Sequence, residues 1–186
     1  MNYEMIIGLT AIFVTITIPI VVFLIKKFYT IPYLTLEIKL RECQSSPIGF
    51  SNESILTSEG YIDGDEEIQF FEIECKLEFI IRNNSNNSAF FPKLYIINNS
   101  INLTEIDKIN YNDPIKACDL KIIQYKYIYK EKKTIGKRSD LNEFPVQMEN
   151  LEILLSYKNE SNTNFYTLFK FLNKTNKGIK WKHPKI

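Results

Sequence analysis

An uncharged segment of 21 residues near the N-terminus limits what this chain can fold into more than any other feature. It covers residues 5–25, MIIGLTAIFVTITIPIVVFLI. A helix rises about 1.5 Å per residue, so this length would cross the roughly 30 Å hydrocarbon core of a bilayer. We therefore expect one transmembrane helix over residues 5–27, preceded by a short tail, 1–4. The residues assigned to this membrane anchor are Met5, Ile6, Phe13, Pro19, Phe23, Ile25, Lys26 and Lys27.

A cleaved signal peptide is the alternative interpretation of this segment. Such a peptide needs a basic start, a short apolar core and a cleavage site of small residues. No Lys or Arg precedes the segment, and Lys26 and Lys27 follow it directly. A retained anchor is therefore the better interpretation. The same two lysines predict, by the positive-inside rule, that the following domain lies in the cytoplasm. Seven N-x-S/T sequons suggest export instead, but the Asn-rich composition accounts for them.

The part of the chain after Lys27 carries 21 basic and 21 acidic residues, so it has no net charge. Nucleic-acid binding requires a basic excess, and we expect no nucleic acid as a partner. The charges are nevertheless segregated, with nine acidic residues in 53–78 and seven basic residues in 121–138. We favour solvated surfaces that attract one another across the domain. The alternative is a basic patch on anionic lipid, formed by Lys130, Lys132, Lys133, Lys137 and Arg138.

Alternating apolar and polar residues predict β-strands throughout the rest of the chain. The pattern is clearest over residues 33–41, 68–82 and 120–129, and a hairpin is expected from 151–158 and 165–172. About seven short strands with polar turns and few helical patterns favour an antiparallel β-sandwich. We expect this mainly β domain over residues 33–173, after a linker, 28–32, and before a basic C-terminal tail, 174–186.

Two segments resemble immunoglobulin-like domains. The segment KLEFIIRNNSNNSAFFPKLYI resembles a strand–turn–strand unit of such domains, and LEILLSYKNESNTNFYTLFKF resembles their last two strands. The resemblance implies an immunoglobulin-like β-sandwich behind a membrane anchor. It does not extend to the Cys…Trp…Cys signature of true immunoglobulin domains, and it implies no particular function.

Residues for catalysis or metal binding are scarce in this chain. The single histidine, His183, lies in a Lys-rich tail, and no nucleophile, zinc or nucleotide-binding motif occurs. Cys43, Cys75 and Cys118 are far apart and odd in number, so we expect no disulfide framework and no metal site. Cys75 should be a small buried apolar residue, while Cys43 and Cys118 should flank loops. No cofactor is expected.

The combined expectation is a single-pass membrane protein without catalytic activity. The anchor would place the chain in the lipid bilayer, and the β-sandwich would serve as a binding or assembly module for a partner protein. The alternative is a pilin-like or other structural subunit, because an N-terminal apolar helix before a β domain is also the layout of pilins. An enzyme is the least favoured class.

Overall fold

A computed structural model describes residues 3–50, 68–97, 101–107, 110–134 and 143–179 of the chain. It contains one α-helix, followed by eight strands and one short 3₁₀ helix in these ranges. The fold is mainly β, with two antiparallel sheets of four strands each. This arrangement is compatible with the predicted β-sandwich.

The helix α1 runs from Tyr3 to Tyr29, two residues beyond each end of the predicted 5–27. Its described side chains are those of residues 12–25, and they are exposed except at Thr17, which is half-buried. Thr17 donates its hydroxyl hydrogen to the carbonyl of Phe13 at 2.7 Å, so this polar group is satisfied within the helix. Among the residues whose side chains are described, which in α1 are 12–25, no helix is both long enough and apolar enough to span a membrane.

The first sheet has the strand order β1-β2-β5-β4. Its strands are β1 (Leu34–Phe50), β2 (Ile68–Asn83), β5 (Leu120–Thr134) and β4 (Leu103–Glu105). The predicted strands 33–41 and 120–129 are present, but both extend further. Residues 44–50, which contain Ser, Pro and Gly and lie beyond the predicted strand 33–41, also pair with β2, because the long partner strand continues beside them.

The second sheet has the strand order β3-β6-β7-β8. Its strands are shorter: β3 (Phe90–Ile96), β6 (Glu152–Lys158), β7 (Asn164–Lys170) and β8 (Thr175–Ile179). The expected hairpin is confirmed in β6 and β7, which pair antiparallel. β8 lies within the segment expected to be a tail. The 3₁₀ helix η1 (Val146–Asn150) precedes β6 and buries Met148 in the core.

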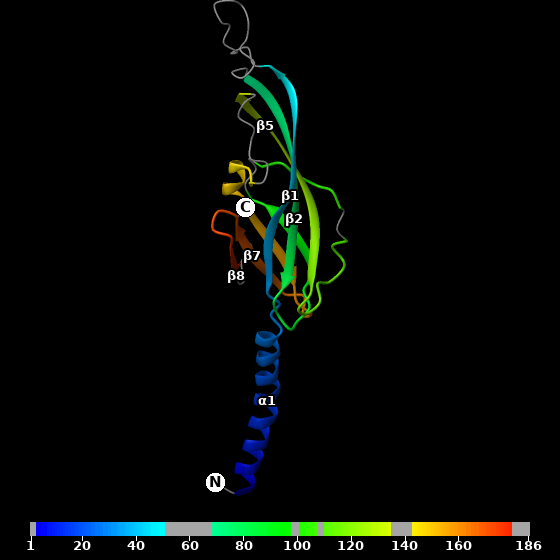
Figure 1. Ribbon diagram of the computed structural model, residues 1–186. Coiled ribbons are helices and arrows are strands. Elements are labelled where there is room, and N and C mark those ends of the chain that lie inside the picture. The colour runs from blue at the N-terminus through cyan, green and yellow to red at the C-terminus, as the bar shows by residue number, and fades with distance from the viewer. Residues whose placement is uncertain (1–2, 51–67, 98–100, 108–109, 135–142, 180–186) are drawn as a thin grey trace, which may run out of the picture.

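The hydrophobic core lies between the two sheets. Alternation in β2 places Leu77, Phe79 and Ile81 on the inner face, as the sequence predicts. Ile153 and Leu155 of β6 belong to the same cluster from the second sheet, and both are fully buried. The strands β1, β2 and β5 extend beyond the second sheet at one end of the sandwich, whereas α1 leaves from the other end (Figure 1).

Side chains of the second sheet bond to the edge of β1 and join the two layers. Asn176 of β8 accepts a hydrogen bond from the Leu36 N–H at 2.8 Å and donates its amide hydrogen to the Leu36 carbonyl at 3.0 Å. Thr167 of β7 donates to the carbonyl of Leu34 at 2.9 Å. Edge strands leave backbone groups unpaired, so these bonds protect the start of β1.

A disulfide bond joins Cys43 and Cys75, so the expectation of no disulfide was wrong. The two residues lie directly opposite one another in the β1–β2 pair, with Cα atoms 4.1 Å apart. The sequence did not reveal this bond, because the two cysteines are 32 residues apart and only the register of β1 against β2 brings them together. Cys75 is buried, as expected, and Cys118 is an exposed free thiol.

Candidate functional site

Charged side chains cover the outer face of the first sheet and mostly pair with one another. Alternation in β2 turns Glu72, Glu74, Lys76, Glu78 and Arg82 to this face. The ion pairs that join neighbouring strands there are Arg41–Glu78, Lys76–Glu42, Arg82–Glu37 and Lys126–Glu74. The acidic and basic segments of the sequence are thus brought together on adjacent strands.

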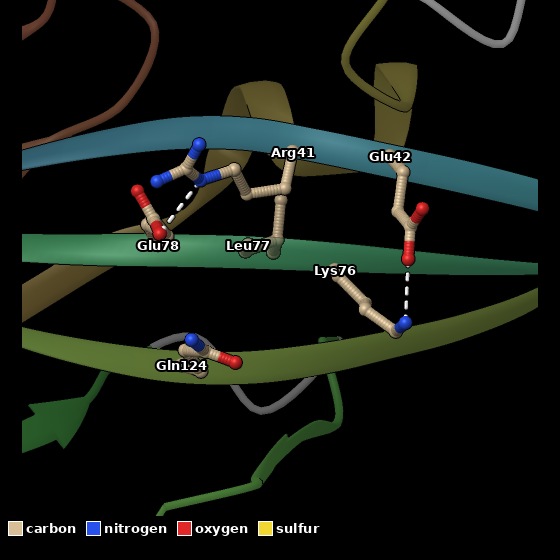
Figure 2. Close-up of a pocket in the computed structure, with 6 residues that line it drawn as sticks. All are labelled: Arg41, Glu42, Lys76, Leu77, Glu78 and Gln124. Carbon is tan, nitrogen blue, oxygen red and sulfur yellow. Dashed lines mark hydrogen bonds and ion pairs between the residues drawn. The ribbon is translucent and has the colours of Figure 1, made fainter.

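A shallow hollow of about 380 Å³ lies on this face, where a β-bulge interrupts the β1–β2 pairing between Leu40 and Glu42. Bulges redirect side chains, and here Arg41 is the extra residue. In Figure 2, Arg41 and Glu42 reach from β1 toward Glu78 and Lys76 of β2. The Arg41 Nε lies 2.6 Å from Glu78 Oε1, and the Glu78 side chain is only 8% exposed.

The second pair in the hollow is more exposed. Lys76 Nζ lies 2.5 Å from Glu42 Oε1, and both side chains are about half exposed. The hydrogen bond to Glu42, together with the charge of that carboxylate, raises the pKa of Lys76. Each cation in the hollow therefore already has a carboxylate, and a charged ligand would have to displace one. The hollow is a poor candidate for a binding site.

The basic residues singled out in the sequence are only partly described. Lys130, Lys132 and Lys133 lie in β5, whereas Lys137 and Arg138 lie outside the described residues. Lys130 stands opposite Glu72 of β2, and Lys133 Nζ lies 3.0 Å from Glu131 Oε1. This placement fits the expectation that the basic and acidic segments attract one another. Contact of the basic residues with anionic lipid stays a prediction.

The residues assigned to the anchor all lie in α1. The side chains of Phe13, Pro19, Phe23 and Ile25 are exposed. Those of the other four, Met5, Ile6, Lys26 and Lys27, are outside the described part of the structure. His183 also lies outside it.

A second hollow, of about 400 Å³, lies on the outer face of the second sheet. We call it the aromatic–lysine cleft. Its walls come from three adjacent strands and from the connection that precedes β5. The lining residues are Phe91, Lys93, Tyr95, Tyr111, Asn112, Ser156, Lys158, Asn164 and Tyr166.

Strand register sets the positions of these side chains. Lys93 of β3, Ser156 of β6 and Tyr166 of β7 lie side by side across the sheet, and Lys158 lies next to Asn164. Tyr166 is only 7% exposed and forms part of the floor. The rings of Phe91 and Tyr95, at 45% and 38% exposure, stand at the rim.

The backbone of Phe91 adopts an unusual conformation, with φ at 51°. This left-handed region is unfavourable for a bulky residue and costs about 1–3 kcal/mol. The residue precedes Pro92, within an irregularity of the β3–β6 pairing between Phe90 and Lys93. The irregularity presents the Phe91 ring to solvent, and the ammonium of Lys158 lies 5.8 Å from the ring centroid.

Tyr111 brings a hydroxyl group to the cleft from outside the sheet. Its O–H donates to Glu105 Oε2 at 3.3 Å. Burial raises the pKa of Tyr111, and the nearby carboxylate of Glu105 raises it further. The phenol therefore stays protonated at neutral pH, and its single hydrogen is directed to Glu105.

Sequence reasoning did not identify this cleft. The alternation of Phe91, Lys93 and Tyr95 on one face of β3 was the available signal. Tyr111 and Asn112 come from a connection without periodicity, and nothing in the sequence placed them there. In the described ranges, no three His, Cys, Asp or Glu side chains are close enough to hold a metal ion.

No family model matches the chain, and no curated protein or solved structure is significantly similar to it. The two-sheet architecture therefore stands on the structure alone, and immunoglobulin-like identity stays a prediction.

Proposed function

We propose that this protein is a single-pass membrane protein whose β-sandwich is a non-catalytic binding or assembly module for a partner protein. The observation that carries the membrane attachment is the apolar surface of α1. Eleven large apolar side chains between residues 12 and 25 are 44–70% exposed. The flanking helical residues extend the uncharged stretch to the 21 residues of 5–25.

The exposed surface of α1 needs an apolar environment. Covering a Val, Leu, Ile or Phe side chain contributes about 1.5–3 kcal/mol, so eleven half-exposed ones would contribute roughly 10 kcal/mol. A bilayer supplies that environment, and the 27-residue length of α1 corresponds to about 40 Å at the usual helical rise. The hydroxyls of Thr15 and Thr17 bond to backbone carbonyls within the helix, which removes their need for water.

The side of the membrane is argued from two opposing features. Lys26 and Lys27 favour a cytoplasmic domain. The Cys43–Cys75 bond favours the opposite side, because disulfides form and persist in oxidising compartments. Two lysines are a weak orientation signal, whereas a reducing compartment would oppose the bond directly. We place the sandwich on the oxidising side.

Membrane extraction of the full chain tests the anchor. The protein should stay in the membrane fraction through high-salt and carbonate washes. A variant with Ile16→Lys and Ile20→Lys should be released, because each charge near the centre of a bilayer costs about 2.5–3.5 kcal/mol. The matched control is Val146→Lys, which alters an exposed apolar residue of the sandwich. Release of the unaltered protein by salt would refute the anchor.

Labelling with a membrane-impermeant maleimide tests the side. Cys118 is the reactive thiol, since Cys43 and Cys75 are bonded to each other. The reagent should label Cys118 in intact cells and should not label Cys118→Ser. If Cys118 is labelled only after the membrane has been opened, the sandwich lies in the cytoplasm, as Lys26 and Lys27 predict.

Cross-linking in membranes, followed by identification of the products, tests the class of function. A binding module should give products with a different protein. A ladder of products containing only this chain would favour the pilin-like alternative, and turnover of a bound substrate would favour an enzyme.

A further inference from the structure

We propose that the aromatic–lysine cleft binds an acidic sugar residue, that is, a pyranose ring bearing a carboxylate. This goes beyond the membrane-anchored role proposed above and does not depend on it. The first support is shape, because the cleft measures about 400 Å³ and small-molecule sites typically measure about 300–1,000 Å³. A single sugar unit of a longer glycan would fit this space.

Charge supports an anionic ligand. Lys93 and Lys158 line the cleft, and no acidic residue does. Among the described residues, no ion pair joins either lysine to a carboxylate. This differs from the hollow in Figure 2, where each cation is paired. The carboxylate of Glu105 lies beside Tyr111 and accepts its hydroxyl hydrogen. An incoming carboxylate would find two available ammonium groups.

The aromatic rim supports a ligand with a flat apolar face. Phe91 keeps its ring exposed through a backbone conformation that a phenylalanine rarely adopts. Such outliers persist where the surrounding structure holds them, and they concentrate at binding sites. Tyr95 is also at the rim, and Tyr166 lies below in the floor. One face of a pyranose ring presents C–H groups that can pack on such rings.

Polar side chains complete the match to a sugar. Asn112, Asn164 and Ser156 line the cleft beside the aromatic rings. Their amide and hydroxyl groups both donate and accept hydrogen bonds, as the hydroxyl groups of a sugar require. A nucleotide, like an acidic sugar, has a ring that can pack on the aromatic side chains and an anionic group for the lysines. It has fewer hydroxyl groups, however, to bond to these polar side chains. The combination therefore favours an acidic sugar.

Binding is tested on the full chain in detergent micelles by isothermal titration calorimetry. The probe is a tetrasaccharide of alternating glucuronate and N-acetylglucosamine. The neutral N-acetylglucosamine tetramer and uridine monophosphate are the comparison ligands. We expect saturable binding of the acidic probe that weakens as salt is added, and at least tenfold weaker binding of both comparison ligands.

Two variants separate a binding role from a structural role. Phe91→Gly removes the ring and relieves the unfavourable φ, so it should weaken binding at least tenfold while the melting temperature stays equal or rises. The double variant Lys93→Gln and Lys158→Gln should abolish the salt-dependent binding. The control is Phe70→Ala, which removes an exposed ring from the other sheet and should leave binding unchanged.

Several outcomes would overturn the proposal. These are no binding of the acidic probe, equal or tighter binding of either comparison ligand, and binding that survives Phe91→Gly. None of these results depends on whether α1 spans a membrane, so failure here is distinguishable from failure of the proposed anchor.

Discussion

Reduction of the Cys43–Cys75 bond should destabilise the sandwich by an amount that follows from its position. The bond joins residues separated by 32 positions and therefore closes a loop of about that length in the unfolded chain. The chain-entropy relation for such a cross-link gives about 3.7 kcal/mol at 25 °C. This is a large fraction of the total stability of a domain of this size, which is typically about 5–15 kcal/mol.

The folded state should tolerate loss of the bond. Cys43 and Cys75 are flanked on both sides by β1–β2 pairs, from Leu34 opposite Asn83 to Phe50 opposite Gln69. Reduction therefore leaves the strand pairing intact, and the effect should come mainly from the greater freedom of the unfolded chain.

Urea unfolding of the full chain in detergent micelles measures this effect, with circular dichroism in the β region as the signal. A reductant should lower the unfolding free energy of the sandwich by about 3–4 kcal/mol. It should have no effect on the double variant Cys43→Ala and Cys75→Ala, which already lacks the bond. Cys118→Ser is the matched control and should behave like the unaltered protein.

The reasoning would be refuted by any of three results. One is a change below about 1 kcal/mol on reduction, which is far below the value that the chain-entropy relation gives for a loop of this length. Another is an equal effect of reductant on the double variant. The third is loss of stability in Cys118→Ser, which would assign the effect to the exposed thiol.

Three further predictions concern single side chains, and urea unfolding measures each. Asn176→Ala should cost about 1–3 kcal/mol, because two partly buried backbone groups at the edge of β1 lose their partner. Arg41→Met should cost about 2 kcal/mol, because it leaves the buried carboxylate of Glu78 unpaired, and adding Glu78→Gln should restore most of the loss. By contrast, Lys76→Met should have no measurable effect, because that pair is solvated. Burial raises the pKa of Tyr125 in the folded state, and the negative charge of Glu105 raises it further. In the unfolded chain the pKa of Tyr125 is about 10. The neutral tyrosine therefore contributes fully to the free energy of unfolding below about pH 10, and this contribution falls as the pH rises further. Tyr125→Phe should make the loss of stability at alkaline pH shallower.

The sequence predicted most of the strands because their alternation is regular. From Phe71 to Ile81 an apolar residue occupies every second position, and this periodicity places one face in the core whatever the partner strand is. The buried side chains of Leu77, Phe79 and Ile81 confirm that assignment. The same holds for Ile153 and Leu155 in the hairpin. Where one face is buried, the local pattern alone decides the structure.

The strands that the sequence missed lack this pattern. Residues 44–50 and β8 (Thr175–Ile179) are polar and Gly-containing, and their strand structure comes from a neighbouring strand that supplies hydrogen bonds. The aromatic–lysine cleft was missed for a related reason. It depends on the order β3-β6-β7, which brings residues 93, 156 and 166 side by side. The positive φ of Phe91 depends on a local irregularity in that pairing.

The disulfide shows how one inserted residue changes what alternation predicts. In β1, the even-numbered residues Leu36 and Leu40 point to the inner face, so strict alternation would turn Cys43 outward. Cys75 of β2 points inward, and a bond between opposite faces is impossible. The bulge at Arg41 shifts the later residues by one position and turns Cys43 to the inner face, opposite Cys75. The same insertion directs Arg41 to Glu78. A single residue without a partner in the strand pairing therefore creates both the covalent bond and the ion pair between Arg41 and the buried carboxylate of Glu78. Neither could be read from the sequence, because the position of a bulge is fixed by the pairing of two strands and not by either strand alone.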